Sequence, residues 1–398
     1  MRNNYISCRF LPAKLNIRYS VINTSVKQNN THLSMVEFAK KRREQHSKKW
    51  TRFDPKFTPL WIADMDFVIC SHIRDEMQTI LQNETFGYAY IPSSATMSII
   101  DWCEQRYHWS IDQDWIVWLP GIVPAFSLVK ELFTPPDHKI LIQSPNYPPL
   151  LDSAQHLNKP FELIPSLFCQ KQQKWRMDFS ALEQQFQTSK TSIFSFANPA
   201  NPLGYTFSEK ELNQITTLCK EYDVLICSDE IHCDLSFDLK PHIPMAKISP
   251  ENSITLMAAS KTFNIAGLNT AFAIIPNEQL RTQFKQAAEQ RVGGPSILGA
   301  AATQAAFKHG NPWRLEVLEY LQGNRDLIHA WGEQQKLEQH YLPEATHLYW
   351  LKLPYQHFID HQIVPSRGKE FGDANFNRIN FACERSLLEK ALSRLSSI

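Results

Sequence analysis

Three polar segments in the middle of the chain each follow a short apolar run and carry side chains that can do chemistry. Asn201 lies within ANPANPLGY, Asp229 within SDEIHCD and Lys261 within SKTFNIAGL. A lysine amine becomes a nucleophile or a base when burial lowers its pKa, and a carboxylate can hold a neighbouring cation. A lone lysine after a strand is usually a solvated loop residue, and a lone aspartate there is usually a helix N-cap. The three segments together, in this order, are far more specific.

The apolar runs around these segments predict the strands of a buried sheet. Each run is short and apolar on both faces, which is typical of a parallel strand covered by helices on both sides. The runs span residues 115–119, 139–143, 191–196, 224–228, 254–258 and 271–275. Ser208 and Glu211 form a capping box that predicts a helix between two of the runs. We therefore expect an α/β fold with a mostly parallel central sheet sandwiched by helices, with ligands bound at the carboxyl ends of its strands.

The C-terminal part predicts a smaller α+β domain. The segments HLYWLKL and FNRINFA are expected to be strands, and Ser386 with Glu389 is expected to cap a final helix. The beginning of the chain is expected to complete this domain. The predicted division is an extension over 1–34, the N-terminal part of the small domain over 35–60, the large domain over 61–305 and the C-terminal part of the small domain over 306–398.

Residues 1–34 carry five basic residues and no acidic one. An Arg- and Ser-rich, acid-poor leader is typical of organelle transit peptides. No apolar helical stripe is evident, which favours a disordered extension, or sequence upstream of a start at Met35. No apolar region follows the basic residues, which argues against a secretory signal.

Composition excludes several classes of partner. With 41 basic and 40 acidic residues the net charge is +1, so we expect no nucleic acid as partner. No apolar run is long enough to span a membrane, and no membrane partner is expected. The eight cysteines form no CxxC pair and no Cys/His ligand spacing, so we expect no metal and reduced thiols in the cytoplasm. The motifs GxGxxG, GxxxxGK[ST], HExxH and GxSxG are also absent from the sequence.

The three segments around Asn201, Asp229 and Lys261 resemble those of the fold-type I pyridoxal-phosphate enzymes, the aspartate aminotransferase superfamily. More narrowly, the chain resembles the cystathionine β-lyase and cysteine-S-conjugate β-lyase branch over roughly residues 45–398. The narrower resemblance rests on PLWIADMDF (59–67), FGYAY (86–90), LPGIVPAF (119–126), SPNYPPLL (144–151), SDEIHCD (228–234), SKTFNIAGLNTAF (260–272) and RINFACERSLLEKAL (378–392). It implies the pyridoxal-phosphate-dependent transferase fold, with pyridoxal 5′-phosphate as cofactor in the large domain.

The resemblance assigns roles around the cofactor ring. It implies that Lys261 joins the cofactor covalently and later moves the substrate's α-proton. Asp229 is expected opposite the pyridine nitrogen, where a buried carboxylate keeps that nitrogen protonated. Asn201 is expected to donate to the ring hydroxyl, and Tyr147 to stack on the ring. His232 stands where many aminotransferases have a tyrosine, and its role stays open between a donor to the ring hydroxyl and a packed structural residue.

The phosphate is expected at a helix N-terminus, where free N–H groups and the helix dipole favour an anion. The resemblance places Gly121, Ile122 and Val123 in this phosphate cup, with a hydroxyl from Ser260. Family members often carry Ser or Thr three residues before the lysine. This chain has Ala258 there, which removes one donor.

Two further residues are expected to complete the site. Arg378 matches the arginine that binds the substrate carboxylate, and it is preferred over Arg385. Tyr88 resembles a residue that reaches the phosphate of a neighbouring subunit, which implies a homodimer with shared active sites. Asp64 and Asp66 belong to the matched motif, but the sequence assigns them no chemical role.

The predicted activity is α,β-elimination on L-cystathionine or another cysteine S-conjugate, giving thiol, pyruvate and ammonia. An aminotransferase would use the same lysine, aspartate, asparagine and arginine, so this alternative stays open. A non-catalytic binding protein on the same fold is a second alternative. Such a protein would have no use for a cofactor ring that takes up electrons, and this argues against it. A DNA-binding regulator is disfavoured, because residues 1–45 hold no evident helix-turn-helix.

Overall fold

The computed structural model describes residue 44 and residues 47–237 and 241–396. The expectations for 1–34, whether extension or targeting segment, lie outside the described residues.

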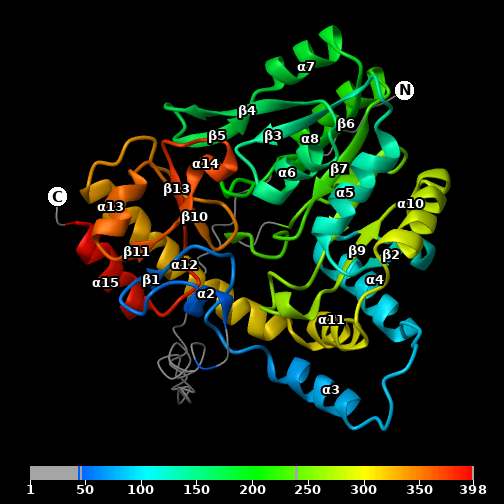
Figure 1. Ribbon diagram of the computed structural model, residues 1–398, viewed down its shortest axis with the longest axis horizontal. Coiled ribbons are helices and arrows are strands. Elements are labelled where there is room, and N and C mark those ends of the chain that lie inside the picture. The colour runs from blue at the N-terminus through cyan, green and yellow to red at the C-terminus, as the bar shows by residue number, and fades with distance from the viewer. Residues whose placement is uncertain (1–43, 45–46, 238–240, 397–398) are drawn as a thin grey trace, which may run out of the picture. The chain divides into compact units, whose positions relative to one another are not determined.

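An eight-stranded sheet forms the centre of the fold, with the strand order β2-β9-β8-β7-β6-β3-β4-β5 (Figure 1). Its strands are β2 (Ile116–Leu119), β3 (Lys139–Ser144), β4 (Phe161–Cys169), β5 (Lys174–Met177), β6 (Thr191–Ala197), β7 (Leu225–Asp229), β8 (Ser253–Met257) and β9 (Ala271–Ile274). Five adjacent strands, from β8 to β4, pair in parallel. β9 pairs antiparallel with both β2 and β8, and β5 pairs antiparallel with β4.

The sheet confirms the prediction of a mostly parallel α/β core. Every residue of β6, β7, β8 and β9 is buried, as two-sided apolar runs require. β9 nevertheless runs antiparallel to its neighbours. The sequence could not predict this, because full burial does not encode the direction of a strand. None of the predicted apolar runs corresponds to β4 or β5. β4 lies near the edge of the sheet and exposes several of its residues, so it lacks a continuous apolar run.

Helices cover both faces of this sheet (Figure 1). One face is covered by α5 (Ile122–Phe133), α6 (Pro148–His156) and α10 (Glu278–Arg291). The other is covered by α3 (Ser71–Leu81), α4 (Ser93–Tyr107), α7 (Phe179–Thr188), α8 (Glu209–Glu221), α9 (Met245–Ile248) and α11 (Ile297–His309). Short 3₁₀ turns occur at η1 (Gln113–Trp115) and η3 (Ala266–Leu268). The capping box of Ser208 and Glu211 is confirmed at the start of α8.

A smaller group of elements gathers the two ends of the described chain. The antiparallel sheet β10-β13-β12 comprises β10 (Leu348–Leu351), β12 (Ser366–Arg367) and β13 (Asn377–Asn380). The N-terminal strand β1 (Thr58–Pro59) pairs in parallel with β11 (Ile363–Val364). The helices here are α2 (Lys48–Thr51), α12 (Asn311–Gln334), α13 (Tyr355–Asp360), α14 (Gly368–Phe371) and α15 (Arg385–Leu395). The division at 60/61 and 305/306 stays a prediction.

The predicted cap of the last helix is wrong. α15 begins at Arg385 with Glu384 as N-cap, two residues earlier than expected. The hydroxyl of Ser386 donates to the Glu384 carboxylate (2.6 Å) and does not cap the helix together with Glu389. The Arg385 N–H instead donates to the Tyr320 hydroxyl (2.7 Å), a contact made by the tertiary fold that no local motif encodes.

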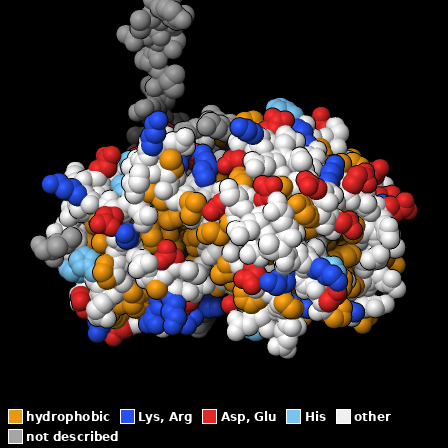
Figure 2. Space-filling model, turned by 90° about the horizontal axis from the view of Figure 1, so that it is seen from above, with side chains coloured by type: hydrophobic (Ala, Val, Ile, Leu, Met, Phe, Trp, Pro, Cys, Tyr) orange, Lys and Arg blue, Asp and Glu red, His pale blue; other side chains and the backbone are white. Residues whose placement is uncertain are grey.

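Basic and acidic side chains are interspersed over the face shown in Figure 2, in keeping with the near-zero net charge. Among the described residues, no helix combines the length and the apolar character needed to cross a bilayer.

Candidate active site

The carboxyl ends of the like-directed strands bring the predicted residues to one edge of the sheet. β2 runs in the same direction as β8, because each is antiparallel to β9. Gly121 follows β2, Tyr147 follows β3, Asn201 follows β6, Asp229 ends β7 and Lys261 follows β8. All of these residues line one cavity of about 260 Å³.

Almost the whole predicted set meets in this cavity. Besides the five strand-end residues, its walls include Ile122, Val123, His232, Ser260 and Arg378. Tyr88 is the exception. It lies in the exposed segment between α3 and α4, its side chain is fully accessible, and it does not line the cavity of its own chain.

Lys261 lies in the turn after β8, with its amine inside the protein. Nζ donates a hydrogen bond to the carbonyl oxygen of Ala63 over 2.8 Å. Burial lowers the pKa of Lys261 to about 8. The negative charges of Asp64 and Asp229 oppose this fall, and the positive charge of Arg378 adds to it. The amine is therefore neutral in roughly one molecule in ten at pH 7, far more often than an ordinary lysine, and a base must be neutral to accept a proton.

Asp229 is the last residue of β7 and is buried. Burial raises the pKa of its carboxyl to about 7, while a hydrogen bond from the Ile231 N–H (3.1 Å) and the charge of Lys261 act in the opposite direction. A buried carboxylate of this kind gains stability when a cation is placed against it. A protonated ring nitrogen in the cavity would supply that cation.

Arg378 on β13 approaches the cavity from the smaller group of elements. Nη1 donates to Oδ1 of Asn201 (2.9 Å), and Nη2 donates to the Trp61 carbonyl (3.0 Å) and the Ser366 hydroxyl (3.1 Å). Its planar group lies over the Phe371 ring at 4.5 Å. Burial lowers the pKa of Arg378 to about 10. Within the described part of the chain its Nε is buried without a hydrogen-bond partner, so the group retains donor capacity for an anion.

The N-terminus of α5 forms one end of the cavity. Gly121 is the N-cap residue and no side chain caps the helix, so the first backbone N–H groups keep their capacity for an anion. Ile122 and Val123 lie in this first turn, and Ser260 lies on the same cavity wall. Ala258 also lines the wall, and its methyl side chain offers no hydroxyl there.

His232 lies deep in the wall, with its ring 5.7 Å from that of His347. Burial lowers the pKa of both histidines well below the ordinary value, and the charges of Lys261 and Arg378 lower each of them further. Both rings are therefore neutral near neutral pH. Among the residues that the structure places, Nδ1 of His232 has no hydrogen-bond partner.

Several wall residues were not singled out from the sequence. They are Ile62, Ala63, Pro120, Ile231, Ala266, Asn269, Thr270 and Ala271. All eight lie inside the segments that carry the family resemblance, and that resemblance was the available signal. Their role as wall residues depends on how the irregular segments before α3 and β9 fold back, and no periodicity encodes that path.

The donor set fits pyridoxal phosphate. One cavity combines an uncapped helix N-terminus for a phosphate, a buried carboxylate for a ring cation and a buried amine for an aldehyde. Within residues 47–237 and 241–396, the buried Nδ1 of His232 and Nε of Arg378 find no hydrogen-bond partner, and a polar ligand in the cavity would supply one.

Comparisons with known proteins agree with this arrangement. Residues 58–395 match the model of the family described as aminotransferase class I and II. A cystathionine β-lyase of Corynebacterium glutamicum is 30% identical, over 89% of this chain and 97% of its own length. The crystal structure of OvoB is 34% identical with a TM-score of 0.84, covering 89% of this chain and 96% of that one. The pyridoxal-phosphate-bound C–S lyase of Staphylococcus hominis is 28% identical with a TM-score of 0.82, covering 89% and 96%.

Proposed function

The chain belongs to the aminotransferase class I and II family, and from that premise we propose that it cleaves the carbon–sulfur bond of L-cystathionine or another cysteine S-conjugate. The enzyme is a pyridoxal-phosphate-dependent C–S lyase. The choice of substrate within this class is our proposal, and so are the roles of the individual residues.

The residues of the cavity would hold the cofactor at four places. The α5 N-terminus from Gly121 would bind the phosphate, Tyr147 would lie against the ring and Asn201 would donate to the ring hydroxyl. Asp229 would hold the ring nitrogen in its protonated state. When bound, the cofactor supplies an electron sink for the pair released as the substrate's α-proton leaves.

The chain's own residues then bind the substrate and move its proton. Arg378 would bind the α-carboxylate, because its guanidinium is already oriented by Asn201 and Trp61. Lys261 would accept the α-proton as a neutral amine, since its pKa is about 8. The thiolate on the β-carbon would leave and be released as thiol, and the remaining three-carbon unit, 2-aminoacrylate, would react with water to give pyruvate and ammonia.

We also propose a homodimer. Tyr88 lies in an exposed segment with Phe86 and Tyr90, and all three side chains are largely accessible in the single chain. A contiguous exposed aromatic segment is typical of an interface. Pairing with a second copy would cover it and bring Tyr88 toward that copy's phosphate site. A cytoplasmic location stays a prediction from the cysteine pattern.

The observation that carries the proposal is the convergence of Lys261, Asp229 and Arg378 on one cavity from three separate elements. The test is to incubate the protein, loaded with pyridoxal phosphate, with L-cystathionine and to measure free thiol and pyruvate. Lys261→Ala is the matched control and should give neither product. Release of neither product by the loaded wild-type enzyme would overturn the proposal. Turnover that depends on an added keto acid would point to an aminotransferase instead.

A further inference from the structure

The segment from Trp61 to Phe67, which contains the unassigned Asp64 and Asp66, follows strand β1 and belongs to no ladder. A backbone bond from the Asp66 N–H to the Ala382 carbonyl oxygen (2.9 Å) holds it, and side chains supply most of its other contacts. Asn380 donates to the carbonyls of Ile62 (2.6 Å) and Asp64 (2.7 Å). Irregular backbone inside a protein needs such partners, because each buried carbonyl must be hydrogen-bonded.

A second asparagine holds the far end of the segment. Asn264 donates to the carbonyls of Met65 (3.2 Å) and Phe67 (2.8 Å), and it accepts from the Met65 N–H (3.2 Å). Asn264 lies three residues after Lys261, and Asn380 lies two residues after Arg378. The segment therefore joins the two parts of the chain that carry the proposed catalytic amine and the proposed carboxylate-binding arginine.

Both of those functional groups also bind the segment directly. Lys261 Nζ donates to the Ala63 carbonyl (2.8 Å), and Arg378 Nη2 donates to the Trp61 carbonyl (3.0 Å). Ile62 and Ala63 line the cavity. A displacement of this backbone would therefore move the acceptors that orient Lys261 and Arg378.

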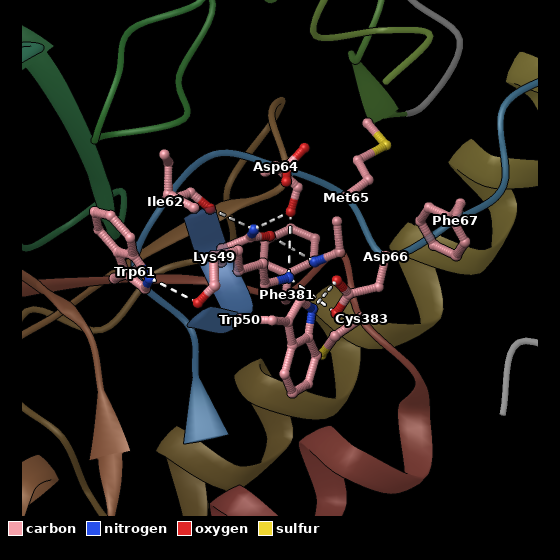
Figure 3. Close-up of polar contacts among 12 residues, drawn as sticks. Lys49, Trp50, Trp61, Ile62, Asp64, Met65, Asp66, Phe67, Phe381 and Cys383 are labelled. Atoms are coloured by element: carbon pink, nitrogen blue, oxygen red, sulfur yellow. Dashed lines mark hydrogen bonds and ion pairs between the residues drawn. The ribbon is translucent and has the colours of Figure 1, made fainter. Parts of the chain in front are cut away.

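A buried ion pair also holds the segment (Figure 3). Lys49 Nζ lies 2.9 Å from Oδ2 of Asp66 and 3.2 Å from the Asp64 carbonyl oxygen, and the Lys49 side chain is fully buried. The Trp50 indole donates to Oδ1 of Asp66 over 2.8 Å. The Trp61 indole donates in turn to the Lys49 carbonyl (3.2 Å).

We propose that Lys49 and Asp66 are positioning residues that act on Lys261 and Arg378 through the Trp61–Phe67 backbone. This inference rests on the proposed function of those two residues. A buried ion pair often contributes little net stability compared with apolar side chains, but it holds its partners in a defined geometry. Here the geometry it defines is that of the wall beside the amine.

The test compares two tryptophan variants that each remove one indole hydrogen bond of the same length, to a carboxylate in one case and to a hydroxyl in the other. Trp50→Phe removes the 2.8 Å bond to Asp66, and Trp331→Phe removes a 2.8 Å bond to the Ser396 hydroxyl, distant in the chain from the segment. The two indoles are buried to similar extents, with 6% and 7% exposed. Each variant is measured for its thermal midpoint, its affinity for pyridoxal phosphate as apo-protein, and its kcat and KM with L-cystathionine.

We expect Trp50→Phe to lower kcat/KM about tenfold, because a shift of a fraction of an ångström misplaces the reacting groups. Its apo-protein should also bind pyridoxal phosphate several-fold more weakly. Trp331→Phe should leave both functional measurements within twofold, even where it lowers the thermal midpoint. Asp66→Asn should act more strongly than Trp50→Phe, and Lys49→Arg, which keeps the cation, should act less strongly than Lys49→Met.

Equal functional losses in Trp50→Phe and Trp331→Phe would overturn the inference, as would wild-type kinetics and cofactor affinity in a folded Asp66→Asn protein. Failure of the proposed function has a different signature. In that case the wild-type protein itself would release no pyruvate, and the cofactor affinities of the apo-proteins would still decide whether Lys49 and Asp66 position the site.

Discussion

Nη1 of Arg378 donates a hydrogen bond to Oδ1 of Asn201 across 2.9 Å. A guanidinium can only donate, so this contact sets the orientation of the Asn201 amide, whose oxygen must face the arginine. The NH₂ group of the amide is then left to donate. The residue that we expect to bind the substrate carboxylate thus also orients the residue that we expect to bind the cofactor hydroxyl.

The first prediction concerns this pair. Arg378→Lys should raise KM for L-cystathionine about tenfold or more, because an ammonium cannot bind both carboxylate oxygens in the same plane. It should also weaken the cofactor affinity of the apo-protein, because Asn201 loses its orienting partner. A double-mutant cycle with Asn201→Ala, read as cofactor affinity, should give a coupling of about 1 kcal/mol. Additive effects would show that the two side chains act independently.

The second prediction concerns Asp229 and pH. Its carboxyl has a pKa of about 7 in the folded protein against an ordinary 3.8, so the unfolded chain ionises first. The contribution of Asp229 to the free energy of unfolding of the apo-protein should therefore fall by about 1.4 kcal/mol per pH unit between pH 4 and 7. The buried neutral rings of His232 and His347 act in the opposite direction below pH 6.5, so the Asp229 contribution is read as the difference from Asp229→Asn. Asp229→Asn should match the wild type near pH 4 and be more stable above pH 7. Urea titrations of both apo-proteins at the two pH values measure this difference.

Asp229→Asn should have the opposite effect on function. The amide cannot hold the ring nitrogen in its protonated state by charge, so kcat should fall about a hundredfold or more. If Asp229→Asn is more stable than the wild type at pH 8 and nearly inactive, then the Asp229 carboxylate lowers the stability of the apo-protein but is needed for activity. An Asn variant with wild-type kcat would remove Asp229 from the mechanism.

The third prediction concerns the amine of Lys261. Because its pKa is about 8, the neutral fraction should rise between pH 7 and 9 in the folded apo-protein. Competitive acetylation followed by peptide mass spectrometry should show this midpoint at Lys261. The same residue in denatured protein should show the ordinary lysine value of about 10.4. A midpoint near 10 in the folded protein would mean that the amine is not desolvated.

The sequence predicted the mostly parallel α/β core and the strand ends at which the candidate site residues lie, but not every strand direction or contact. Asp229 and Lys261 follow apolar runs whose burial on both faces is visible in the residues themselves, so their meeting at the sheet edge could be inferred. The antiparallel direction of β9 could not be inferred, because a fully buried strand has the same apolar pattern whether it runs parallel or antiparallel to its neighbours. The contact between Lys49 and Asp66 was also invisible, since neither local periodicity nor a cap motif encodes a side chain that reaches from α2 to an irregular segment.

The fourth prediction tests the shared active site. Tyr88→Phe and Lys261→Ala subunits should each have low activity alone. Mixing them with exchange of subunits should restore about a quarter of wild-type activity, because half of the dimers then contain one site with both wild-type residues. Sedimentation velocity should confirm that the mixture is dimeric. No recovery in a mixture that has exchanged would place Tyr88 outside the partner's site.

The bond between Trp61 and Arg378 spans 317 residues of chain. During synthesis the part of the cavity wall formed by Ile62 and Ala63 therefore emerges long before the strand that carries Arg378. A nascent chain that ends before β13 would carry Lys261 with one side of its pocket unsupported. Premature termination near the C-terminus should thus yield a protein whose central sheet can form but whose cofactor pocket stays open on the side of Trp61.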